Sequence, residues 1–226
     1  MFSYDQTFVF VVIGFVLCCL AAVKVRVIFK NNKSVKSQNG ITGRDAAEKI
    51  LQTKGLFDVE IQRTSGKMTD HYDTRRRIMH LSDSSYYSES IAAVGIAAHE
   101  CGHAALHDQG NMFFQIRETL DPFVRFCASS SWMLMLAGFV TEVKRADFIL
   151  NLGILFFVGA VIFQIATLPV EVNASKIAVH MLENTNILVS GEMEQIKKIL
   201  SAVSLMHIVS NISLVLTIFN IDLFEE

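Results

Sequence analysis

The residues best suited to chemistry lie together at positions 99–103, where the chain reads His99-Glu100-Cys101-Gly102-His103. On a helix the two histidines lie one turn apart, about 6 Å along the axis, so both imidazoles can bind one metal ion. Glu100 is turned about 100° around the helix from His99, so its carboxylate lies beside a water bound to that ion. It is therefore placed to act as a general base. The alternative is coincidence, because such a pattern arises by chance in about one chain of this length in two hundred.

A catalytic zinc ion needs a third protein ligand and an open position for water. The long pattern of the metzincin enzymes would place that ligand at position 109, which is Gln109, so this class is disfavoured. His107 is a candidate third ligand, but it lies about 12 Å from His99 along a continuous helix, so the helix would have to break for both to bind one ion. The alternative for His107 is a packing or supporting role. Glu171 is the other candidate, and its alternative role is a favourable charge at a helix start marked by Pro169.

Two helices are predicted around these residues. The stretch from Ile91 to His107 is rich in alanine and lacks proline, which predicts a buried helix with Ser88 as its N-cap. Earlier in the chain, Thr42 and Asp45 have the spacing of a capping box, and the short amphipathic helix that they begin ends at Gly55.

Three segments between these helices, 57–62, 68–73 and 77–82, are predicted strands, and the plain interpretation is a small antiparallel sheet. The segment 68–73 is also a candidate for pairing with an extended substrate, with an ordinary hairpin as the alternative.

Composition points to a membrane protein. Of the 226 residues, 51% are apolar and 19% are charged, and the mean hydropathy is +0.39, which exceeds what a water-soluble domain of this length needs for its core. The net charge of -2 offers no broad basic surface, so nucleic acid is excluded as an expected partner. The four cysteines have no regular spacing, which argues against a disulfide framework.

Four apolar segments are candidate membrane spans, at about 8–29, 126–140, 148–168 and 199–218. Basic residues follow the first span at Lys24, Arg26, Lys30, Lys33 and Lys36. Their excess predicts that the soluble insert at about 30–121 is cytoplasmic and that both termini lie outside. The same topology returns Glu171 to the cytoplasmic surface, where the two histidines lie.

Several further segments match a known family. They are 56–61, 69–73, 90–93, 97–104, 168–171 and 173–175. With them, most of the chain resembles the YugP-like neutral zinc metallopeptidases of bacterial membranes, which are distantly similar to HtpX-type and CAAX-prenyl proteases. The resemblance implies that His99 and His103 are zinc ligands, that Glu100 is the catalytic base and that Glu171 is the third ligand, as in the Glu-zincin group. HtpX-like relatives have Asp four residues after the ligand Glu, whereas this chain has Ser175, whose hydroxyl can accept an imidazole N–H but brings no charge.

The sequence therefore predicts one integral membrane domain over residues 1–226. We expect a mainly α-helical bundle of about four spans with a small cytoplasmic α+β insert and a zincin-type HExxH active-site helix. The predicted site has Glu100 as its catalytic residue and His99, His103 and Glu171 as ligands, with Ser175 and His107 as supporting residues.

The expected function is that of a multi-pass endopeptidase of the cell membrane with one zinc ion per chain. Its active site faces the cytoplasm, and a water activated by zinc and by Glu100 attacks peptide bonds of membrane or membrane-proximal proteins. Donors to the developing oxyanion are sought among five residues, His71, Tyr72, Tyr86, Lys176 and His180. The alternatives are a non-catalytic scaffold stabilised by zinc and, from His207 and Asn211 in the last span, an ion transporter. The sequence does not define the substrate-binding residues or the oligomeric state.

Overall fold

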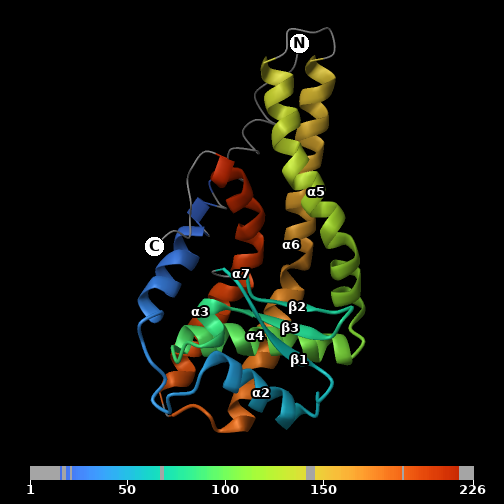
Figure 1. The fold of residues 1–226 in the computed structure, drawn as a ribbon. Coiled ribbons are helices and arrows are strands. Elements are labelled where there is room, and N and C mark those ends of the chain that lie inside the picture. The colour runs from blue at the N-terminus through green and yellow to red at the C-terminus, as the bar shows by residue number, and fades with distance from the viewer. Residues whose placement is uncertain are drawn as a thin grey trace. The chain divides into compact units, whose positions relative to one another are not determined.

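Helices make up most of the described chain in the computed structural model, and a small sheet precedes the longest of them (Figure 1). The structure describes residues 16, 19–20, 22–66, 69–140, 146–189 and 191–218, with side chains as far as Leu205. The elements follow one another as α2 (Gly43–Lys54), β1 (Glu60–Thr64), β2 (His71–Asp73), β3 (Ile78–Ser82), α3 (Asp83–Tyr86), α4 (Ile91–Asp108), α5 (Met112–Val140), α6 (Ala146–Thr185) and α7 (Glu192–Ile218).

The two helices predicted around the site are present. Thr42 is the N-cap of α2 and accepts a hydrogen bond from the Asp45 backbone N–H, and Gly55 ends the helix in the left-handed conformation with φ of 81°. Helix α4 is buried along nearly all of its length, as predicted. Its N-cap is Ser90 and not Ser88, because the Ser90 hydroxyl accepts from the Ala93 backbone N–H.

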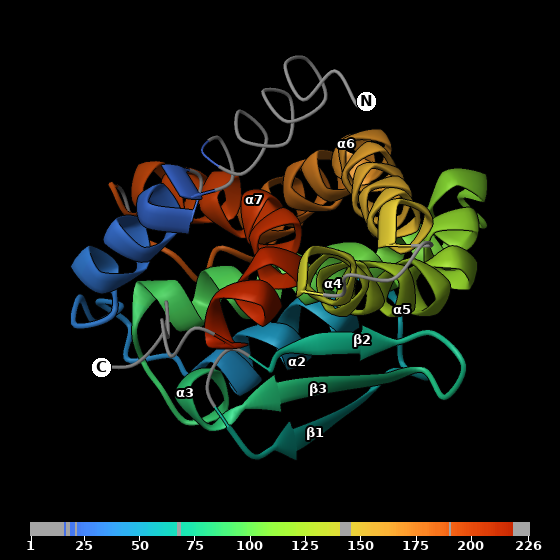
Figure 2. The ribbon, with the colours of Figure 1, turned by 90° about the horizontal axis from the view of Figure 1, so that it is seen from above.

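The sheet is mixed, so the prediction of an antiparallel sheet is wrong. Its strand order is β1-β3-β2, in which β1 pairs with β3 in parallel and β2 pairs with β3 in antiparallel orientation. Strand β2 is therefore an edge strand, and it lies beside α4, which also contacts β3 (Figure 2). Alternation of apolar residues identifies strands, but it does not say which strand takes the centre of the sheet.

The chain divides into two compact units, each of which has its own packing. One unit contains residues 24–115 and 169–205, and within it α4 packs against the part of α6 after Pro169 and the part of α7 before Met206. Its largest fully buried apolar side chains include those of Phe114, Met79, Leu106, Leu182 and Ile199. This unit holds every described residue of the predicted site.

The other unit includes residues 116–168 of α5 and α6. Both helices are long and apolar enough to cross a membrane, and only 17% of the apolar window of each is buried. The backbones approach closely, since a Cβ atom added at Gly138 would lie 2.7 Å from the Leu150 nitrogen, and one added at Gly153 would lie 2.8 Å from the Met135 nitrogen. Close approach at small residues is how helices pack in lipid, so the pair fits membrane association.

The other predicted spans are not tested. The first, at 8–29, lies largely outside the described residues, and the last, at 199–218, lies in α7, whose side chains are described only to Leu205. The predicted limit of the insert at residue 121 falls inside α5, which continues through Pro122. Helix α6 also continues through Pro169, so the alternative that Pro169 begins a helix is wrong, and Glu171 lies in a helix interior.

Candidate metal and catalytic site

Helix α4 places His99, Glu100 and His103 as their spacing predicts. The rings of the two histidines are edge to face, with centroids 4.6 Å apart, and one ligand atom from each of the three residues falls within 4.8 Å of the others. All three side chains are buried, at 0%, 1% and 3% exposure. The three are therefore close enough together to share one ion.

Glu171 of α6 joins this cluster from across the helix interface. Its Oε2 atom lies 3.1 Å from the Nε2 atom of His99 and 3.5 Å from the Nε2 atom of His103. Ligands 2.0–2.1 Å from a tetrahedral zinc ion are separated from each other by about 3.3 Å. Both distances from Glu171 match that separation, so the three residues fit a zinc ion.

Gly102 permits this approach of α4 to α6. A Cβ atom at Gly102 would overlap the backbone carbonyl oxygen of Ala174, so only glycine allows the two helices to pack this closely. Ala174 lies one turn after Glu171 and next to Ser175 on α6. The close packing at Gly102 thus brings both polar residues of α6 to the histidines.

Ser175 fixes the orientation of the His99 ring. Its Oγ atom lies 2.9 Å from His99 Nδ1, 3.0 Å from the Leu200 carbonyl oxygen and 2.7 Å from Ser204 Oγ. Because a carbonyl can only accept, the Ser175 hydroxyl donates to Leu200 and accepts from His99 Nδ1–H. The His99 Nε2 lone pair then faces Glu171 Oε2, and two electron-rich atoms this close are stabilised by a cation between them.

Ser204 and Phe114 also belong to the site, although sequence reasoning missed both. Ser204 lies on α7 against Ser175, and its hydroxyl is 3.3 Å from the backbone carbonyl oxygen of Glu171. Phe114 is fully buried, and its ring stacks on His103 with centroids 5.6 Å apart. Neither residue has a sequence signal, because a serine and a phenylalanine in apolar helices are ordinary packing residues.

His107 is not brought to the other two histidines. Its Nδ1 atom is 3.0 Å from the Tyr72 hydroxyl, and its ring is 6.3 Å from that of Phe114. Helix α4 is continuous, so His107 lies one turn beyond His103. This agrees with the expectation that an unbroken helix keeps His107 away from an ion bound by His99 and His103.

Of the five candidate oxyanion donors, Tyr72 is the one that the described structure buries against α4. His71 lies on the opposite face of β2, where its ring stacks on His80 with centroids 4.7 Å apart. Tyr86 packs against the neighbouring Tyr87, and Lys176 and His180 are exposed.

Cys101 takes no part in the cluster, although it lies within the motif. Its thiol points to the Ala47 carbonyl oxygen at 3.7 Å, between α4 and α2. Burial, followed by the nearby charge of Glu100, raises the pKa of this thiol, so it stays protonated and is a poor metal ligand.

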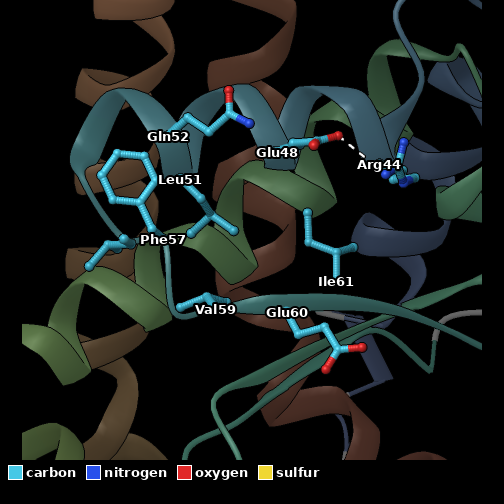
Figure 3. A pocket seen from close by; sticks show the side chains of 9 residues that line it. Arg44, Glu48, Leu51, Gln52, Phe57, Val59, Glu60 and Ile61 are labelled. Carbon is cyan, nitrogen blue, oxygen red and sulfur yellow. Dashed lines mark ion pairs between the residues drawn. The ribbon is translucent and has the colours of Figure 1, made fainter.

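A cavity of about 280 Å³ lies elsewhere in the same unit, between α2 and β1 (Figure 3). Apolar side chains such as Leu51, Val59 and Ile61 line it, and the ion pair of Arg44 and Glu48, 3.3 Å apart, borders it. None of the predicted ligands or the predicted base lines this cavity.

Comparison with known proteins agrees with the class of site that this geometry defines. The model of the family described as "Putative neutral zinc metallopeptidase" matches residues 7–224, and the chain belongs to this family. It is 36% identical over 188 residues to a Bacillus subtilis protein named "Putative membrane protease YugP", a match that covers 83% of this chain and 82% of that protein. No solved structure matches the chain.

Proposed function

We propose that the chain is a zinc-dependent integral membrane endopeptidase of the Glu-zincin type. His99, His103 and Glu171 would hold one zinc ion, and Glu100 would be the general base. The observation that carries the proposal is the position of Glu171 Oε2, within 3.1 Å and 3.5 Å of both histidine Nε2 atoms. Membership of a zinc metallopeptidase family and the named membrane protease among its relatives support it.

A bound zinc ion supplies a Lewis acid that polarises a peptide carbonyl and makes a water molecule acidic. The Glu100 carboxylate would accept a proton from a water molecule beside it while the oxygen of the water attacks the carbonyl carbon. Glu100 then gives the proton to the amide nitrogen, which leaves as an amine when the carbon–nitrogen bond breaks. Ser175 holds His99 in the tautomer that leaves Nε2 available to the metal.

The substrates in this proposal are membrane or membrane-proximal proteins, and the active site faces the cytoplasm. Two features support the setting, the exposed apolar surfaces of α5 and α6 and the basic residues that follow the first predicted span. Strand β2, at the edge of the sheet beside α4, would pair with an extended peptide.

A non-catalytic scaffold held together by zinc is the second candidate. The near-complete burial of all four polar side chains favours it, because structural zinc sites are closed whereas catalytic sites keep an open position. The two candidates differ in what they require of Glu100.

Zinc content and peptide cleavage of the detergent-purified full chain, measured on Glu100→Gln and Glu171→Gln beside wild type, test the proposal. We expect about one zinc per wild-type chain, zinc retained but cleavage reduced about 10²- to 10⁴-fold in Glu100→Gln, and weakened zinc binding in Glu171→Gln. Cleavage at the wild-type rate by Glu100→Gln would contradict the hydrolytic role. A zinc-bound wild type that cleaves nothing and unfolds when zinc is removed would favour the scaffold.

A further inference from the structure

Three histidines follow one another along α4 at intervals of four residues, and the third has no role in the proposed metal site. His99 and His103 are almost fully buried, whereas His107 is only half-buried. Phe114 contacts both of the later rings, at 5.6 Å from His103 and 6.3 Å from His107. The His107 ring therefore lies on the same side of α4 as the proposed ligands, at the more accessible end of the row.

Tyr72 of the edge strand β2 contacts His107 directly. The Tyr72 hydroxyl lies 3.0 Å from His107 Nδ1, and the two rings are 5.8 Å apart. Burial raises the pKa of Tyr72, while the charge of Arg77 opposes that shift, so the phenol stays protonated at neutral pH. An imidazole nitrogen is a stronger acceptor than a phenol oxygen, so the Tyr72 hydroxyl donates to His107 Nδ1.

Arg77 is itself held in place by two carboxylates. It lies in the turn between β2 and β3 with φ of 56°, and it forms ion pairs with Asp58 at 2.8 Å and with Asp108 at 3.3 Å. Asp108 is the residue that follows His107 on α4. The strand, the turn and the end of the helix thus meet around the hydrogen-bonded pair of Tyr72 and His107.

The hydrogen bond from Tyr72 fixes the tautomer of His107. An imidazole that accepts at Nδ1 carries its proton on Nε2. Within the described part of the chain, the His107 Nε2 atom has no hydrogen-bond partner. A donor of fixed direction is thus available one helical turn from the proposed zinc ligand His103.

We propose that His107 donates its Nε2–H to the carbonyl oxygen of a bound peptide substrate, and that Tyr72 and Arg77 are positioning residues for it. This inference rests on the proposed peptidase function. A peptide paired along β2 would lie beside both Tyr72 and the row of histidines, since β2 is an edge strand and contacts α4. A donor of fixed direction stabilises the negative charge that develops on that oxygen, and loss of one such donor lowers kcat about 10²- to 10³-fold.

The experiment compares His107→Leu, His107→Gln and Tyr72→Phe with wild type in the detergent-purified, zinc-loaded full chain. The kinetic readouts are kcat and KM on a fluorogenic peptide, with zinc per chain measured on the same samples. We expect His107→Leu to lower kcat about 10²-fold with zinc unchanged, and His107→Gln, whose amide still donates, to lose less. His80→Gln is the matched control, because His80 lies on the opposite face of the sheet, and its kcat should equal that of wild type.

A second readout does not depend on activity. Nitrogen-15 spectra of histidine-labelled protein, assigned with His107→Gln, should show the Nε2–H tautomer in wild type and a mixture in Tyr72→Phe. An Nδ1–H tautomer in wild type, or wild-type kcat in an active His107→Leu protein, would overturn this inference alone. A zinc-bound wild type that cleaves no peptide would overturn the proposed function and the inference with it.

Discussion

His99 is oriented by the hydroxyl group of Ser175, which lies 2.9 Å from its Nδ1 atom. Ser175 can play this part because its one hydroxyl proton goes to the Leu200 carbonyl oxygen, 3.0 Å away. A lone pair of the hydroxyl oxygen is then available to accept from His99 Nδ1–H. The ring orientation is therefore retained without a second buried charge beside Glu171.

Removal of this hydroxyl should weaken metal binding. We expect Ser175→Ala to raise the dissociation constant for zinc about 10- to 100-fold, since the His99 tautomer and ring are no longer fixed. Competition with a chromogenic zinc chelator measures the change. Thr185→Ala is the control, because the buried Thr185 hydroxyl bonds only the Leu182 carbonyl oxygen of the same helix among the described residues, and its zinc affinity should stay close to that of wild type. Equal affinities in Ser175→Ala and wild type would remove Ser175 from the site.

The sequence predicted some site residues better than others, and the reason is local spacing. His99, Glu100 and His103 lie within five residues, so helical geometry alone places them together. Glu171 is 72 residues beyond His99 and was identified by the predicted topology and by family resemblance. Phe114 and Ser204 could not be identified, because their position at the site depends on how distant helices pack.

At the scale of elements, the site depends on the contact between α4 and α6. Gly102 lies inside the motif, and a Cβ atom there would overlap the Ala174 carbonyl oxygen. Gly95 lies earlier on α4, where a Cβ atom would be 2.8 Å from Ile199 Cγ2 of α7. The first obstacle is backbone and cannot move aside, whereas the second is the end of a side chain. Gly102 is therefore the stricter requirement.

Substitution of Gly102 by alanine should separate the two helices and open the site. We expect Gly102→Ala to lower the thermal midpoint of unfolding by several degrees, through overpacking of about 1–3 kcal/mol, and to reduce zinc per chain below that of wild type. Gly159→Ala is the matched control on α6, because a Cβ atom at Gly159 has no neighbour within 4 Å. Differential scanning fluorimetry and elemental analysis of both variants check the expectation. Full zinc content and a wild-type midpoint in Gly102→Ala would contradict the close approach.

Elements were predicted more accurately than their pairing. Capping at Thr42, the left-handed Gly55 and the buried α4 follow from local rules, and each was found. The parallel pairing of β1 with β3 was not foreseen, because β2 joins the far edge of the sheet and leaves β3 in the centre. The continuity of α6 through Pro169 was also missed, since proline more often marks a helix start.

For the whole molecule, the surfaces of α5 and α6 are the main evidence on its surroundings. Large apolar side chains on both helices are strongly exposed, and these include Phe123, Phe126, Met133, Phe139, Phe148, Leu155, Ile162 and Ile165. Exposure of so many large apolar side chains is unfavourable in water and favourable in contact with lipid. From the basic residues after the first predicted span, we expect the segment between the two helices to lie outside the cell and residues 30–121 to lie inside.

Cysteine labelling in intact cells tests this orientation. Gln109 ends α4 in the soluble insert, and Ala146 begins α6, so Gln109→Cys and Ala146→Cys report on opposite sides of the membrane. We expect a membrane-impermeant maleimide to label Ala146→Cys in intact cells and to label Gln109→Cys only after the cells are opened. The unsubstituted chain, with its four native cysteines, gives the background. Labelling of Gln109→Cys in intact cells would place the proposed catalytic site outside, where its substrates would be extracellular segments, because Gln109 is the C-cap of the helix that carries His99, Glu100 and His103.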